Sequence, residues 1–140
     1  MKVHIPLKDH APSPVPAGVY SMEIEKVSTL RTVSGDEGDV EVIDITWKIL
    51  APAMVGDEKT EGRKVIDTYW LVERALWRVS ILSMQLLGIK RKDLPAFEST
   101  EELEAFLLEN MPGQKATVEI EVFEKKDVER NRVKKVFAAA

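Results

Sequence analysis

The sequence predicts a mainly β domain that carries two helices. Several short runs alternate apolar and polar residues, which is the period of strands with one buried face. One stretch in the second half of the chain changes to helical spacing. With 140 residues, 44% hydrophobic and 31% charged, the chain matches an ordinary globular domain that closes a single core.

Residues 1–17 are expected to form an irregular arm. A proline fixes φ and removes a backbone donor, so helices and central strands are unfavourable where prolines are frequent. The folded domain is therefore expected over residues 18–137. The prolines of the arm are Pro6, Pro12, Pro14 and Pro16.

The first two strands are expected over residues 19–30 and 40–50. In both, every second residue is apolar, which is typical of an antiparallel strand with one face in the core. Glycine and acidic residues at 34–39 supply a hairpin turn between them. Trp47 is expected in the core because it shares a face with isoleucines. The apolar face of the second strand is Ile43, Ile45, Trp47 and Ile49.

A third strand is expected over residues 63–71, after a loop at 51–62, because the segment is rich in β-branched and aromatic residues. It contains the adjacent rings Tyr69 and Trp70. Neighbouring strand residues point to opposite faces, so one ring should face outward. The sequence leaves open which one, with a preference for Trp70.

Two helices are expected next. Residues 73–87 carry apolar side chains at helical spacing, and Gly88 occupies the usual C-terminal glycine position. Residues 99–102 match a capping box that opens a second helix over 100–109. Trp77 is expected to pack inside. A second apolar stripe on the first helix also leaves open a homo-oligomer contact. That stripe is Trp77, Ile81 and Met84.

The last two strands are expected over 115–123 and 132–137, joined by a polar loop at 124–131. The resulting order is β-β-β-α-α-β-β. Strands interrupted once by helix between the third and the fourth are typical of a five-stranded OB-type barrel, where helix plugs one end. The sequence therefore predicts this barrel.

A cluster of cations around the last loop indicates nucleic-acid binding. Such groups neutralise phosphates and release counterions, and in an OB fold this loop borders the binding face. Exposed rings add to this, because unpaired bases stack on them. The alternative is an ordinary solvated hairpin. The predicted nucleic-acid-binding residues are Lys48, Lys64, Tyr69, Trp70, Lys125, Lys126, Arg130, Arg132 and Lys134.

Short segments support the same interpretation through their order along the chain. They are PAGVY at 16–20, GRK at 62–64, ALW at 75–77, LGI at 87–89 and RNRVKK at 130–135. In this order they resemble a family of small tailed-phage proteins of unknown function that is grouped with phage single-stranded-DNA-binding proteins. The resemblance covers residues 14–137. It implies a role in phage DNA replication or recombination, with replication or recombination proteins as partners.

We therefore expect a single-stranded-DNA-binding protein with little sequence preference. The alternative is an OB-type adaptor that binds a recombinase or nuclease and has no DNA binding of its own. No enzymatic activity, metal or cofactor is expected, because the chain has no cysteine, no phosphate-loop motif and no nucleophile-elbow motif.

The expected location is the cytoplasm of the bacterial host cell. The lack of cysteine fits a reducing compartment, and the N-terminal segment has no apolar core of signal-peptide length. The longest apolar stretch, residues 81–89, is interrupted by Ser83 and Gln85 and is too short to span a bilayer. No membrane association is expected.

Overall fold

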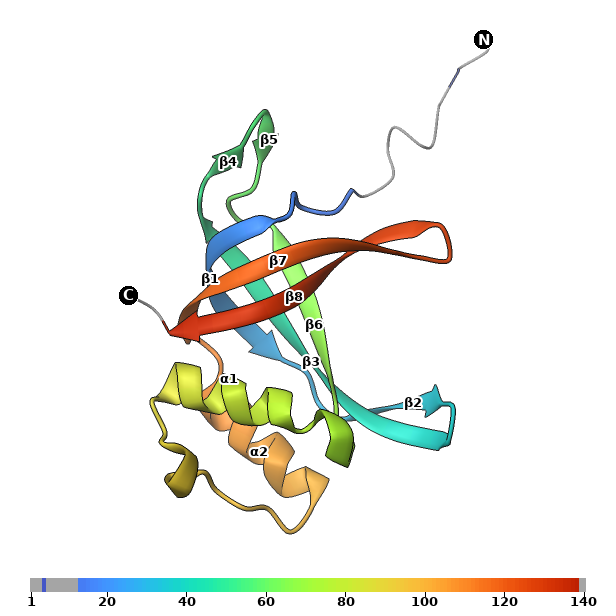
Figure 1. Ribbon diagram of the computed structural model, residues 1–140, viewed down its shortest axis with the longest axis vertical. Coiled ribbons are helices and arrows are strands. Elements are labelled where there is room, and N and C mark those ends of the chain that lie inside the picture. Colours follow the sequence, from blue (N-terminus) through green and yellow to red (C-terminus); the bar gives the residue numbers. More distant parts are fainter. Residues whose placement is uncertain (1–3, 5–12, 139–140) are drawn as a thin grey trace.

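The computed structural model describes residue 4 and residues 13–138, so most of the predicted arm lies outside the described residues. The described chain is mainly β, with one large antiparallel sheet and two helices (Figure 1). The strands of this sheet are β1 (Gly18–Val27), β2 (Arg31–Gly35), β3 (Gly38–Ala51), β6 (Lys64–Trp70), β7 (Lys115–Lys125) and β8 (Val128–Ala138). No helix in the described part of the chain is long and apolar enough to cross a membrane.

The first strand, predicted over 19–30, ends at Val27 as β1, and β2 follows it as a strand that the sequence did not predict; both pair with the same edge of β3. Side-chain bonds explain the interruption. The Ser28 hydroxyl accepts a bond from the backbone N–H of Asp44 at 2.9 Å. The Leu30 N–H leaves the ladder and donates to a carboxylate oxygen of Glu104 at 2.6 Å. Polar side chains thus replace ladder partners at the bend.

The strand order of the large sheet is β6-β3-β1-β7-β8, with every neighbouring pair antiparallel. The sheet curls, and its two end strands, β6 and β8, come close to each other (Figure 1). No backbone ladder joins them in the described part of the chain. The antiparallel sheet is therefore strongly curved but is not closed by hydrogen bonds.

Two predicted loops contain strand. A small hairpin of β4 (Met54–Val55) and β5 (Glu58–Lys59) lies within the predicted loop at 51–62. The predicted polar loop at 124–131 is wrong, because β7 and β8 meet at a two-residue turn. The turn residues Lys126 and Asp127 have φ of 52° and 63°. Positive φ at both central positions is the conformation that matches the twist of a two-residue hairpin. The last two strands thus form a long two-stranded ribbon.

Helix α1 (Trp77–Leu87) begins later than predicted, because residues Glu73–Ala75 form a separate 3₁₀ turn. It ends at Gly88, whose φ of 65° is left-handed, as the sequence predicts. A second 3₁₀ turn (Arg91–Asp93) precedes helix α2 (Thr100–Asn110). The Ser99 hydroxyl accepts from the N–H of Glu102 at 3.2 Å, which confirms the N-terminal cap. Both helices lie at the same end of the sheet (Figure 1).

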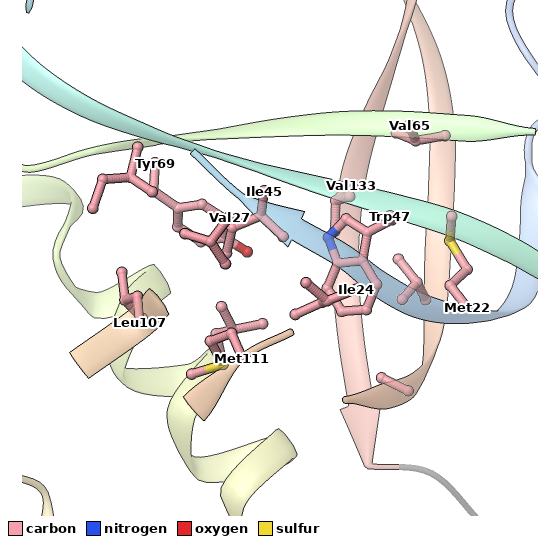
Figure 2. Close-up of a cluster of buried hydrophobic side chains, with 14 of the residues drawn as sticks. Met22, Ile24, Val27, Ile45, Trp47, Val65, Tyr69, Leu107, Met111 and Val133 are labelled. Carbon is pink, nitrogen blue, oxygen red and sulfur yellow. The ribbon is translucent and has the colours of Figure 1, made fainter. Parts of the chain in front are cut away.

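The core lies on the concave side of the sheet and is completed by the helices (Figure 2). Trp47 has 0% exposure, which confirms its predicted place in the core. Val15 also belongs to the core, although residues 13–17 contain neither helix nor strand. The side chain of Asn131 holds it with two hydrogen bonds, one to the N–H and one to the carbonyl of Val15, both 2.9 Å. This segment therefore packs against β8.

Candidate nucleic-acid interface

Strand β6 has two distinct faces. Val65, Asp67 and Tyr69 are buried, whereas Ile66 and Trp70 point outward from the alternate positions. The exposed fraction is 2% for Tyr69 and 37% for Trp70. Trp70 is therefore the outward ring of the adjacent pair, the orientation preferred from the sequence.

The prediction that Tyr69 could contact nucleic acid is wrong, because its ring is buried. The guanidinium of Arg78 lies over this ring, 4.5 Å from its centroid. Burial raises the pKa of the Tyr69 hydroxyl well above its usual value. A base cannot stack on a ring that is already covered on one side by a cation and on the other by the core.

Arg78 also neutralises the one carboxylate that faces inward from β6. Its Nη2 donates to both carboxylate oxygens of Asp67, at 2.9 and 2.8 Å. Its Nη1 donates to the carbonyl of Thr68 at 3.1 Å. Burial raises the pKa of Asp67, and the charge of Arg78 acts in the opposite direction. Sequence reasoning missed Arg78, although an acid on the inward face needs such a partner.

The outer face of β3 and β6 carries Lys48 and Lys64, which lie opposite each other in the ladder. The Nζ of Lys64 lies 3.0 Å from a carboxylate oxygen of Glu25 on β1. Lys48 is half-buried and lies opposite Glu23 in the ladder with β1. Both predicted contacts are thus on one face, but acidic side chains of β1 offset part of their charge.

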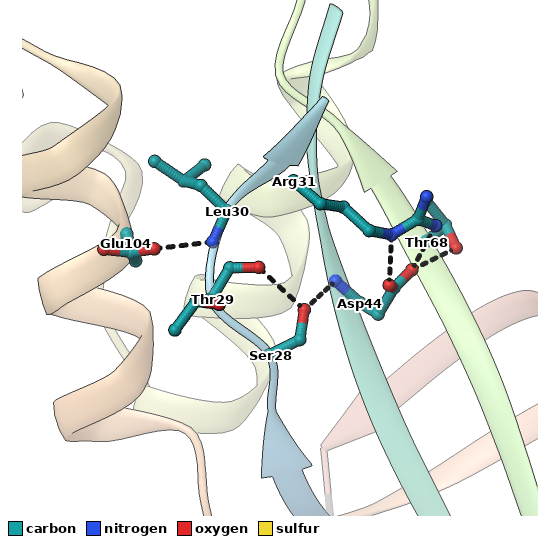
Figure 3. Close-up of polar contacts among 7 residues, drawn as sticks. All are labelled: Ser28, Thr29, Leu30, Arg31, Asp44, Thr68 and Glu104. Carbon is teal, nitrogen blue, oxygen red and sulfur yellow. Dashed lines mark hydrogen bonds and ion pairs between the residues drawn. The ribbon is translucent and has the colours of Figure 1, made fainter. Parts of the chain in front are cut away.

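A polar cluster ties β2, β3 and β6 together on the same outer face (Figure 3). Arg31 donates to the two carboxylate oxygens of Asp44, at 2.6 and 3.0 Å, and the Thr68 hydroxyl donates to the same carboxylate at 2.5 Å. The hydrogen bond from Arg31 holds the pKa of Asp44 below its usual value. The negative charge in the middle of this face is therefore balanced by a cation.

Trp70 lies at the end of this face, next to the β2–β3 hairpin. A Cβ added at Gly35, the last residue of β2, would lie 3.7 Å from the Trp70 ring. The hairpin covers part of the ring and leaves the rest exposed. Trp70 therefore offers a partly exposed ring, on which an unpaired base can stack.

The β7–β8 ribbon carries most of the predicted cations. Lys125, Lys126 and Arg130 are exposed, and none of them forms an ion pair within the described residues. Arg132 Nε donates to Glu121 at 2.5 Å, and its guanidinium lies 4.8 Å from the Phe123 ring centroid. The tip of the ribbon thus carries these three cations beside three acids, Glu124, Asp127 and Glu129, and none of the six forms an ion pair within the described residues.

The charge of Lys134 is partly offset, because its Nζ lies 3.7 Å from a carboxylate oxygen of Glu119. Both side chains remain partly exposed to solvent. Exposed ion pairs of this kind are weak and are screened by salt. A phosphate can therefore compete with Glu119 for Lys134.

The β2–β3 hairpin and the β7–β8 ribbon both project to the right in Figure 1, with β6 between them. Their charges differ. The hairpin tip is acidic, with Asp36, Glu37, Asp39 and Glu41, whereas the ribbon, residues 115–138, carries seven cations and five acids. A polyanion at this face would follow the ribbon and avoid the hairpin tip.

The prediction that Trp77 packs inside is wrong. Trp77 is 60% exposed, and Ile81 and Phe137 are also exposed. Helical periodicity shows which residues share a side of a helix but not how much of that side a neighbouring strand covers. The sequence analysis named Trp77 and Ile81 only as a possible contact between copies of the chain, and it did not name Phe137 or Lys135 of β8 as site residues.

A scan of protein-family models found no match to this chain, and a search of curated proteins found no similar sequence. The resemblance to the tailed-phage family stays a prediction. Within the described part of the chain, no group of three or more His, Cys, Asp or Glu residues could hold a metal ion.

Proposed function

We propose that the protein is an OB-type module that binds single-stranded DNA with little sequence preference, in phage DNA replication or recombination. The strand order supports the OB part of the proposal. A sheet ordered β6-β3-β1-β7-β8, with helices between β6 and β7, has the neighbours and the helix position of a partly open five-stranded OB barrel. In that fold, nucleic acid lies across the face that β3 and β6 form here, between the two projecting hairpins.

The observation that carries the proposal is the β7–β8 ribbon. It carries three exposed cations without ion pairs within the described residues, Lys125, Lys126 and Arg130, and the outer face of β6 exposes Trp70. Phosphates along the ribbon would release counterions, which requires no sequence readout. A base on Trp70 would add stacking, which every base can provide. Cations for the phosphates and an exposed ring for a base are the two kinds of contact that single-strand binding uses.

The test is a fluorescence-anisotropy titration with oligo-dT over a series of salt concentrations. Single-strand affinity changes with a log–log slope of about −0.7 for each neutralised phosphate, so three contacts predict a slope of about −2. No binding at low salt, or a flat salt dependence, would overturn the proposal. In the first case the adaptor function becomes the better explanation.

A matched pair of variants locates the contact. The triple variant Lys125→Gln, Lys126→Gln, Arg130→Gln removes the cations of the ribbon. The control Lys26→Gln, Lys59→Gln, Arg74→Gln removes the same net charge from exposed positions elsewhere. The ribbon variant should lose most of the salt slope, and the control should keep it. Equal losses would show that net charge alone, rather than the ribbon, attracts the DNA.

We propose no catalytic activity. The oligonucleotide should remain intact with Mg²⁺ or Mn²⁺ present, because cleavage of nucleic acid normally uses carboxylates that hold metal ions. Metal-dependent cleavage that a single carboxylate substitution abolishes would contradict this part of the proposal.

A further inference from the structure

A groove lies between α1 and β8, where the curled sheet is open. Its volume is about 380 Å³, and it is lined by α1, by residues 133–137 of β8 and by Tyr69 of β6. Binding sites for small ligands commonly have volumes of about 300–1,000 Å³. The groove is therefore large enough for an aromatic group.

The walls of the groove expose apolar side chains from both elements. Trp77 is 60% exposed and Ile81 43% exposed on α1, and Phe137 is 43% exposed on β8. Single exposed apolar residues are ordinary on a protein surface. Three of them around one groove, one of them a tryptophan, indicate a binding surface.

The charge of the groove favours a polyanion. Lys134 and Lys135 line it, and no Asp or Glu is among the described residues that do. Lys135 forms no ion pair within the described part of the chain. A second copy of this chain would fit less well, because a two-fold contact places the same cations against each other.

The groove lies on the same strand as the cations of the ribbon. Strand β8 carries Arg130 near the ribbon tip and Lys134 and Lys135 at the groove, so one strand joins the two sites. At about 3.3 Å per residue, Arg130 and Phe137 are roughly 23 Å apart along β8. Only a long oligonucleotide can contact both ends.

We infer that the groove between α1 and β8 binds bases of the same DNA strand, with Trp77 as a second stacking platform and with Lys134 and Lys135 on the phosphates. This inference rests on the proposed single-stranded-DNA binding. It extends the site beyond the face of β3 and β6 and assigns a binding role to the first helix.

The test compares Trp77→Ala with wild type in oligo-dT anisotropy. Stacking on an aromatic side chain contributes about 1–3 kcal/mol per base, so affinity for a long oligonucleotide should fall roughly 5- to 150-fold. A dinucleotide, which is too short to contact both ends of β8, should show a smaller loss when it binds at the ribbon. Trp77→Phe should retain most of the affinity. Leu108→Ala, at an exposed apolar position of α2 outside the groove, is the control and should change nothing.

The outcomes separate this inference from the proposed function. Unchanged affinity of Trp77→Ala, with salt-dependent binding retained, would overturn the groove site and leave the proposed function standing. No binding by the wild type would overturn both. A fall in molecular mass of Trp77→Ala in sedimentation, without a loss of affinity, would show that a second copy occupies the groove. An oligonucleotide with photoreactive 4-thiothymidine at its end should crosslink to α1 or to residues 133–137.

Discussion

The two faces of β3 and β6 differ sharply although they belong to the same strands. Trp47 and Tyr69 lie on the inner face and are almost fully buried, whereas Trp70 and Ile66 lie on the outer face and are exposed. Rings one residue apart therefore have different roles. An inner ring contributes to stability, and an outer ring is available to a ligand.

The carboxylates on the two faces show the same contrast. Asp67 faces inward, and burial raises its pKa even though Arg78 binds it in a bidentate manner. Asp44 faces outward, and the hydrogen bond from Arg31 lowers its pKa. Both acids pair with an arginine, so the difference comes from solvent. For Asp67 on the inner face, desolvation raises the pKa more than Arg78 lowers it. For Asp44 on the outer face, the hydrogen bond from Arg31 lowers the pKa more than desolvation raises it.

The largest effect is expected for Trp47→Ala on the inner face. The truncation leaves a cavity in a close-packed core, and such changes lower the free energy of unfolding by about 3–5 kcal/mol. Urea denaturation measures the loss. Trp70→Ala is the matched control and should lose far less. A loss at Trp47 no greater than that at Trp70 would remove the distinction between the faces.

Arg78→Ala should be the next most destabilising change. Removing one partner of a buried ion pair costs about 3–5 kcal/mol, and we expect the lower end, about 3 kcal/mol, because Arg78 is partly exposed. Chemical denaturation should show this loss. Arg31→Ala on the outer face should show a much smaller one.

A double variant sharpens this comparison. In Asp67→Leu, Arg78→Leu, no charge is left buried without a partner, so much of the stability lost in Arg78→Ala should return. If the double variant is as unstable as Arg78→Ala, the loss of stability would come from the missing hydrogen bond between Arg78 and the Thr68 carbonyl, and not from an unpaired Asp67.

On the outer face, Trp70→Ala should weaken oligo-dT binding by about 1–3 kcal/mol through lost stacking, with little change in stability. Tyr69→Ala should do the reverse and lower the melting temperature. Anisotropy and thermal melts on both variants test the pair together. Should folded Trp70→Ala bind as tightly as wild type, stacking on this face would be ruled out, and binding would rest on the ribbon and the groove.

The smallest effect is expected in the pH dependence that Asp44 contributes. Its pKa is lowered in the folded state, so its contribution is fully present above the unfolded pKa, about 3.9, and is lost as pH falls through the folded value. Asp44→Asn should therefore be less stable than wild type at neutral pH and equally stable in strong acid. Melting temperatures across this range measure the difference. If the difference in melting temperature between wild type and Asp44→Asn increased as the pH fell, the pKa of Asp44 would be raised rather than lowered in the folded state.

Much of the fold follows from local pattern. Alternation over 40–50 predicts β3 and its inward residues correctly, because a shift of one residue would turn the whole apolar set toward solvent. Gly88 and the Ser99 cap mark helix ends through backbone chemistry that needs no distant partner. The turn at Lys126 and Asp127 was missed because a lysine with positive φ has no strong sequence signal.

The sequence by itself determined which residues alternate, where the helices end and which strand carries the cations, since these depend on neighbours along the chain. Only the tertiary structure decided which rings are exposed. Trp70 remains partly exposed beside Gly35, and Trp77 remains exposed at the groove between α1 and β8. The physical reason is that exposure depends on what packs against a residue from distant parts of the chain, and periodicity carries no information about that packing.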